Sequence, residues 1–122
     1  MKRVIPIRTN RDKFFRQVLE LLRSLPPFNK LRPRELELLS KLMAYSDEFK
    51  ALDRDSRYDL IFSTRTRRTI ADDLDMSEDA FNNNLSILRR HGLLTKDNRF
   101  APILEDLYYD SKFELTYKFV KE

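Results

Sequence analysis

The chain has 122 residues, enough to bury a hydrophobic core as one domain, and it contains no cysteine and a single glycine. Disulfide frameworks, thiolate zinc sites and glycine-rich nucleotide loops are therefore excluded. Charged residues make up 36% of the chain and give a net charge of +4, a surplus that permits nucleic-acid binding without requiring it. Because no apolar run approaches a membrane span and Met1-Lys2-Arg3 precedes no signal-like stretch, we expect a cytoplasmic protein that does not bind membranes.

Two helices are predicted in the N-terminal part of the chain, within residues 10–49. Thr9 or Asn10 can cap the first helix, whose apolar residues recur at helical spacing until Pro26-Pro27 ends it. The second helix begins with Pro33 in its first turn, and its leucines recur at three- and four-residue steps along one face.

A short strand and two further helices are predicted next. The apolar run Tyr58–Phe62 predicts the strand, after a charged connection. Thr66 suits the N-cap of the first of these helices, and Ser77 suits the N-cap of the second, which ends at Gly92.

The pattern beyond these helices favours strands. Residues 93–96 predict a strand that enters a turn at 96–99, and the strict alternation over 113–120 predicts the clearest strand in the chain. We expect the strands near 93–96 and 114–120 to pair antiparallel. Residues 101–110 leave two alternatives, a short helix opened by Pro102 or an extended excursion.

The segment from Thr66 to Leu94 combines two amphipathic helices with a short turn. The turn is Asp75-Met76, where Asp tolerates the left-handed conformation and Met76 fills the core beneath it. The inward residues are Ile70, Ala71 and Leu74 in the first helix and Phe81, Leu85 and Leu88 in the second. The outward residues of the second helix are Asp79, Asn82, Asn83, Ser86 and Arg90.

This ordered pattern (Ile-Ala, Leu, a turn residue, an apolar residue, Ser, and a helix ending in Leu-x-x-x-Gly-Leu-Leu) resembles the winged helix-turn-helix family. The upstream elements add an arrangement typical of MarR-type regulators and of phage and plasmid replication initiators. The resemblance implies a mainly α fold with a small antiparallel β-wing. It predicts one winged helix-turn-helix domain over 1–122, with N-terminal helices in 10–49, the helix-turn-helix in 64–92, and the wing and C-terminal strand in 93–120.

The resemblance also implies sequence-specific binding of double-stranded DNA in transcription or replication control, with the second helix in the major groove. Its polar outward side chains are the base-reading candidates: Asn82, Asn83, Ser86 and Arg90. The phosphate candidates gather at the start of the first helix and the end of the second: Thr64, Arg65, Thr66, Arg67, Arg68 and Arg89. Lys96 and Arg99 flank the wing turn, where they would contact DNA or lie in solvent.

A protein-interaction module that docks on a polymerase, replisome or other assembly is the alternative function. Glu78 and Asp79 favour it, because carboxylates suit a helix N-terminus but would lie near DNA phosphates. A homodimer is compatible with either function. No catalytic set, nucleotide loop or zinc spacing is present, so we expect no enzyme activity, cofactor or metal.

Overall fold

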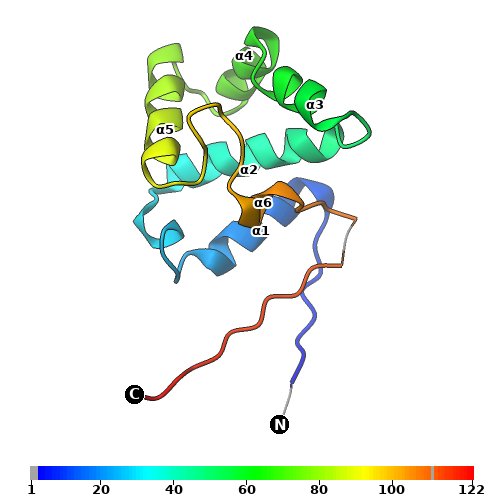
Figure 1. Cartoon of the computed structure of the whole chain (residues 1–122), viewed down its shortest axis with the longest axis vertical. Helices are drawn as coiled ribbons and strands as arrows, with labels where there is room; N and C mark the ends of the chain where they lie inside the picture. The colour runs from blue at the N-terminus through cyan, green and yellow to red at the C-terminus, as the bar shows by residue number, and fades with distance from the viewer. Residues whose placement is uncertain (1–2, 111) are drawn as a thin grey trace.

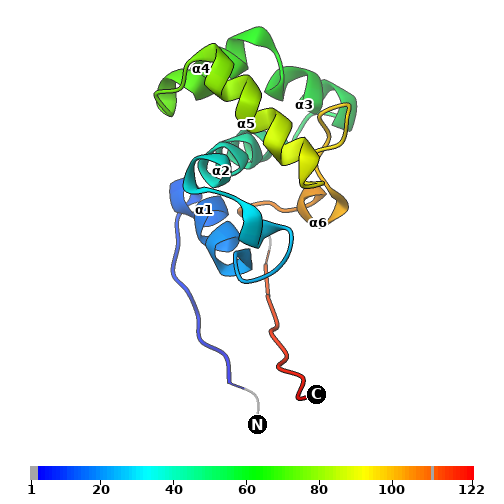
Figure 2. The same cartoon turned by 90° about the vertical axis from the view of Figure 1, so that its left-hand side faces the viewer.

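The computed structural model describes residues 3–110 and 112–122. Met1, Lys2 and Ser111, which the predicted domain 1–122 includes, lie outside the described residues. The elements are α1 (Arg11–Leu22), the 3-10 turn η1 (Phe28–Lys30), α2 (Pro33–Glu48), α3 (Arg54–Ile61), α4 (Thr64–Asp73), α5 (Glu78–Arg90) and α6 (Pro102–Glu105). Figures 1 and 2 show α2 through the middle of the molecule, with α1 on one side and α3, α4 and α5 on the other. None of the described helices combines the length and the apolar character that crossing a membrane requires.

The two predicted N-terminal helices are confirmed together with their start signals. The Asn10 side chain caps α1 by accepting the Lys13 N–H at 3.1 Å. Pro33 occupies the first turn of α2, where its missing N–H removes no helical hydrogen bond. The local signals at these two helix starts therefore determined where each helix begins.

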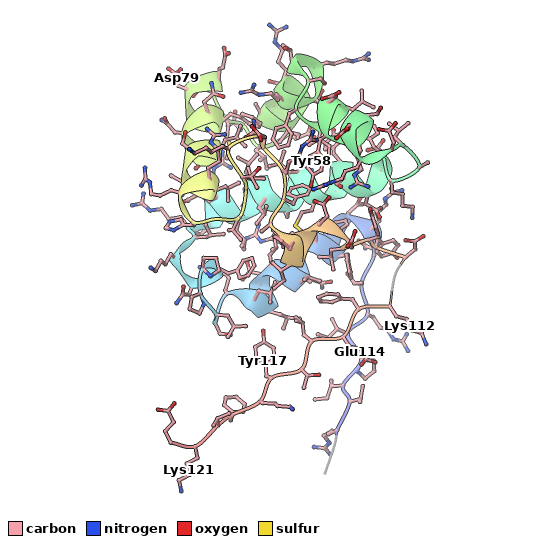
Figure 3. The ribbon with its side chains drawn as sticks, in the orientation of Figure 1. Tyr58, Asp79, Lys112, Glu114, Tyr117 and Lys121 are labelled. Carbon is pink, nitrogen blue, oxygen red and sulfur yellow. The ribbon has the colours of Figure 1, made fainter. Side chains whose placement is uncertain are left out.

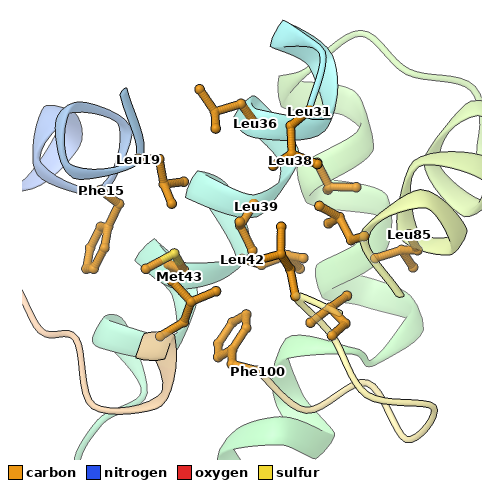
Figure 4. Close-up of a cluster of buried hydrophobic side chains, with 14 of the residues drawn as sticks. Phe15, Leu19, Leu31, Leu36, Leu38, Leu39, Leu42, Met43, Leu85 and Phe100 are labelled. Carbon is orange, nitrogen blue, oxygen red and sulfur yellow. The ribbon is translucent and has the colours of Figure 1, made fainter. Parts of the chain in front are cut away.

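α2 forms the centre of the hydrophobic core, since half of its 16 residues are buried. It contacts α1, α3, α4 and α5. Figure 4 shows its side chains between Phe15 and Leu19 of α1 and Leu85 of α5. Each fully buried leucine stabilises the fold by roughly 1.5–3 kcal/mol. The buried residues of α2 are Glu35, Leu36, Leu38, Leu39, Leu42, Met43, Ser46 and Asp47.

The predicted strand at Tyr58–Phe62 is wrong, because the chain forms α3 there. The Asp53 side chain caps this helix by accepting the Ser56 N–H at 2.9 Å. Tyr58 is buried, whereas Leu60 is 41% exposed, although strand alternation would place both on one face. The helical spacing of the buried side chains therefore decides the structure of this segment.

The predicted β-wing is also wrong, so the described part of the chain is all-α and no strand forms in it. Residues 93–96 make only one isolated antiparallel bridge, between Leu94 and Phe100, which closes the tight turn at 96–99. Residues 113–120 approach α1 instead, where the rings of Phe113 and Phe14 meet edge to face. α6 lies in the connection between the two predicted strands. That connection would have had to bring residues 113–120 back beside residues 93–96 for the strands to pair.

Polar side chains hold the segment that follows α5 against the helical core. The Tyr58 hydroxyl donates to the Glu105 carboxylate and accepts the Phe100 N–H at 3.0 Å. The buried Asp47 carboxylate accepts the Tyr109 N–H at 3.1 Å and pairs with Arg11 at 2.9 Å. Both buried groups are therefore supplied with the partners that burial demands.

We expect Tyr58→Phe to lower the free energy of unfolding by about 1–3 kcal/mol, because it leaves the buried Phe100 N–H without its partner and removes one hydrogen bond from Glu105, which keeps its ion pair with Arg54. Burial of the hydroxyl, together with its hydrogen bond to Glu105, raises the pKa of Tyr58 from 10.0 to about 12. The folded chain then keeps a proton that the unfolded chain loses, so stability should fall as the pH rises from 10.0 to about 12.

Urea unfolding across this pH range checks the expectation, and tyrosinate absorbance should show a late titration near pH 12 that Tyr58→Phe removes. Tyr109→Phe is the control, because its ring keeps the contact with Phe14 and no hydrogen bond of its hydroxyl is found among residues 3–110 and 112–122. Equal losses of stability in the two variants would contradict the role assigned to the Tyr58 hydroxyl.

Candidate nucleic-acid interface

α4 and α5 are joined by a turn of four residues, 74–77, as in a helix-turn-helix. The Asp75 N–H donates to the Asp72 carbonyl at 3.1 Å, and the Met76 N–H donates to the Ala71 carbonyl at 2.8 Å. This pair of bonds is the Schellman motif, which requires a left-handed residue after the helix. Asp75 adopts that conformation with φ 52°, as the sequence predicted.

The end of α5 repeats the same arrangement. The Leu93 N–H donates to the Leu88 carbonyl at 3.0 Å, and the Gly92 N–H donates to the Arg89 carbonyl at 3.0 Å. Gly92 has φ 74°, which confirms the prediction that the only glycine of the chain would end this helix. Leu93 then returns the chain to the core.

Two side chains fix the turn, one from α2 and one from α5 itself. The Arg34 guanidinium of α2 donates to the carbonyl of Leu74 and, at 3.4 Å, to that of Asp75. The buried Met76 lies beneath, and the Asn84 amide approaches its sulfur at 3.6 Å. Neither Arg34 nor Asn84 was predicted from the sequence, and only the contact of α2 with α4 and α5 reveals Arg34.

The outward face of α5 carries most of the predicted base-reading side chains. Asn83, Ser86 and Arg90 are exposed, on the side opposite the buried Phe81, Leu85 and Leu88. Asp79 begins this row at the end of α5 that lies farthest from the two terminal segments (Figure 3). Ser77 caps the helix as predicted, by accepting the Ala80 N–H at 3.1 Å.

Asn82 is placed differently from the other three candidates. Its side-chain oxygen accepts a hydrogen bond from the Arg67 guanidinium, which also lies 5.5 Å from the centroid of the Phe81 ring. These contacts join α4 to α5 beside a groove of about 360 Å³. Asn82 and Arg67 therefore hold the two helices together in this structure.

The predicted N-cap at Thr66 is wrong, because Ser63 caps α4 and accepts the Thr66 N–H at 3.3 Å. The helix thus begins with the exposed Thr64, and Thr66 is half-buried. Arg65 and Arg68 are exposed, and neither has an ion pair within the described ranges. They are the phosphate candidates that the structure leaves accessible at this helix.

The other predicted cationic residues differ in how they are held. Arg89 donates to Asn98 at 2.7 Å and to Ser86 at 3.2 Å, which ties α5 to the following loop. Arg99 lies 4.4 Å from the centroid of the Tyr58 ring and pairs with Asp55 at 3.3 Å. Lys96 is exposed at the tip of the loop. Because no wing forms, Lys96 and Arg99 do not flank a wing turn.

Charge is divided unevenly over this interface. Residues 64–92 contain five arginines and five carboxylates, so the segment has no net charge apart from His91. The carboxylates lie between residues 72 and 79, at the turn and the start of α5. Arg32, which is exposed and lines a groove beside α5 with Ser77 and Asn84, adds a positive charge that the sequence analysis did not consider.

Comparisons with protein-family profiles, with curated proteins and with solved structures found no match for this chain. Within the part of the chain that the structure describes, no group of three or more His, Cys, Asp or Glu side chains is arranged to hold a metal ion. The function must therefore be argued from the interface itself.

We expect Asp75→Gly to raise the free energy of unfolding by about 0.5–1 kcal/mol, because φ 52° strains a residue that carries a Cβ. Gly92→Ala is the matched opposite change and should lower stability by about 1 kcal/mol. An added Cβ at Gly92 would meet nothing within 4 Å, so the backbone alone sets that cost. Urea unfolding measures both changes in stability. An Asp75→Gly variant less stable than the wild type would contradict the backbone strain inferred at Asp75.

Proposed function

We propose that this protein binds double-stranded DNA sequence-specifically in transcription or replication control, with α5 as the reading helix. The observation that carries the proposal is the exposed row of Asn83, Ser86 and Arg90 on a helix held by a four-residue turn. Amide, hydroxyl and guanidinium groups are those that pair with base edges in the major groove. In this proposal the protein acts in the cytoplasm, on DNA that is present there.

Two accessible arginines beside that row support phosphate contacts. Arg65 and Arg68 lie in the first half of α4, where the free N–H groups of the helix start also favour an anion. In the proposal these two side chains supply the sequence-independent part of the affinity.

A protein-interaction module remains the second candidate, and the position of the carboxylates favours it. Glu78 and Asp79 are exposed in the first turn of α5, where they would repel phosphates near the groove. A basic surface on a polymerase, replisome or other assembly would instead be attracted to them. The two candidates therefore differ in the sign of charge that their partner presents.

We expect the double variant R65A/R68A to bind all duplexes more weakly and to flatten the slope of log affinity against log salt by about two units. Fluorescence anisotropy on random duplexes over a series of salt concentrations measures this slope. R16A/R23A is the control, since it removes the same charge from α1 and the residue that follows it, and both arginines pair with Glu20. Equal changes in the two double variants would show that Arg65 and Arg68 contact no phosphate.

We expect Asn83→Ala to lose about 1–3 kcal/mol of discrimination between a selected site and scrambled DNA, because its amide can form a bidentate contact with adenine. Asn83 is exposed, so the free energy of unfolding should change by less than about 0.5 kcal/mol. Titrations on the two duplexes, with the exposed Asn29→Ala as control, measure the difference. If both titrations stay unchanged while binding of a protein partner is lost, the protein-docking function replaces DNA reading.

A further inference from the structure

Residues 112–122 form an extended segment whose apolar side chains are covered unevenly. Phe113 meets Phe14 of α1 with 6.3 Å between ring centroids, and the Tyr117 hydroxyl donates to the Leu21 carbonyl. Figure 3 shows Tyr117 directed toward α1. Phe119 belongs to the same alternating face but is 99% exposed, so no described residue covers it.

The backbone of this segment is also unpaired. No backbone-to-backbone hydrogen bond links residues 112–122 to another described residue, although their alternation is that of a strand. A groove of about 460 Å³ lies between this segment, residues 3–9 and α1. An extended segment whose backbone groups are unpaired, beside a mainly apolar groove, is a template for pairing with another extended segment.

The segment complements itself when two copies run antiparallel with Thr116 opposite Thr116. Glu114 of each copy then faces Lys118 of the other, which gives two opposite-charge pairs on one face. Opposite charges directly across an antiparallel pair stabilise it. The Thr116 side chains meet on the same face, between the two charge pairs.

The other face of this ribbon is apolar in the same register. Phe113 of each copy faces Phe119 of the other, and Leu115 faces Tyr117. Aromatic and aliphatic cross-strand pairs are among the favourable ones. The fully exposed Phe119 is thereby covered by a Phe113 that already lies on Phe14 of its own copy.

Neighbouring registers lose this complementarity. If the pair is centred on Leu115 instead, Lys112 of one copy faces Lys118 of the other. If it is centred on Tyr117, Phe113 faces Lys121. In a parallel, in-register pair each charged residue would face the identical residue of the other copy, so like charges would meet. The N-terminal segment is a poorer partner strand, because Pro6 has no N–H to donate.

We propose that the protein forms a homodimer in which residues 113–119 pair antiparallel, about Thr116, with the same residues of a second copy. The apolar face of the paired ribbon covers α1 of both copies. The proposal does not rest on DNA binding. Both terminal segments leave the molecule on the side of α1, whereas α4 and α5 lie at the other end (Figures 1 and 2).

Charge reversal tests the dimer and its register together. E114K sets Lys against Lys118 and K118E sets Glu against Glu114, so each variant alone should self-associate about tenfold more weakly in sedimentation equilibrium. Mixed in equal amounts, the two variants should form a heterodimer, because every Lys then faces a Glu. The double variant E114K/K118E should associate as the wild type does.

Phe119→Ser supplies a second test that leaves the fold of one copy untouched. Its side chain is 99% exposed, so circular dichroism should remain that of the wild type while self-association weakens. Ile103→Ser is the matched control, since Ile103 is 65% exposed on α6 and takes no part in the ribbon. Its self-association should equal that of the wild type.

Two results would overturn the proposal. A wild-type chain that stays monomeric up to about 1 mM forms no such dimer. A dimer that Phe119→Ser does not weaken, or charge variants that fail to associate when mixed, would show that the copies do not pair through residues 113–119.

Discussion

The burial of α2 is the constraint on which the rest of the structure depends. A helix with half of its residues buried can be stable only when other helices cover the faces that carry them. α1 covers one side, and α3, α4 and α5 cover the remainder. The helix pair α4 and α5 is therefore positioned by α2, and the Arg34 guanidinium fixes their turn from the same helix.

Burial of α2 also determines how the chain continues after α5. Asp47 lies on α2 and is 1% exposed, so its carboxylate needs partners from other segments. Arg11 before α2 and the Tyr109 N–H after α6 supply them. Together with the bonds of Tyr58 to Glu105 and Phe100, they hold the later chain across the core by individual side chains rather than by a sheet.

The features that could be predicted from sequence are those decided within one or two turns of the chain. The cap of α1, predicted at Thr9 or Asn10, the left-handed Asp75 and the helix end at Gly92 all depend on neighbouring residues. Asn10 is the cap, and the other two features were predicted correctly. α3 was missed because a short apolar run fits a strand as well as a helix. Its cap at Asp53 was a local signal that could have decided between the two.

The prediction of a wing failed because a strand requires a partner that its own sequence does not specify. The alternation over 113–120 shows which side chains share a face, but not which segment lies beside them. Contacts between different elements of the candidate interface were likewise not specified by the local sequence. The outward positions of Asn83 and Arg90 followed from helical geometry, whereas the contacts of Arg67 with Asn82 and of Arg99 with Tyr58 join different elements.

Those contacts separate two roles among the arginines of the interface. Arg67 and Arg89 are bound to neighbouring side chains, so a phosphate would have to replace an existing hydrogen bond and would gain little net free energy. Arg65, Arg68 and Arg90 are exposed and carry no such cost. The charge available to a partner of α4 and α5 therefore comes from residues that do not hold the two helices together. The terminal segments lie at the opposite end of the molecule, so the proposed association of two copies and the proposed binding by α5 involve separate residues.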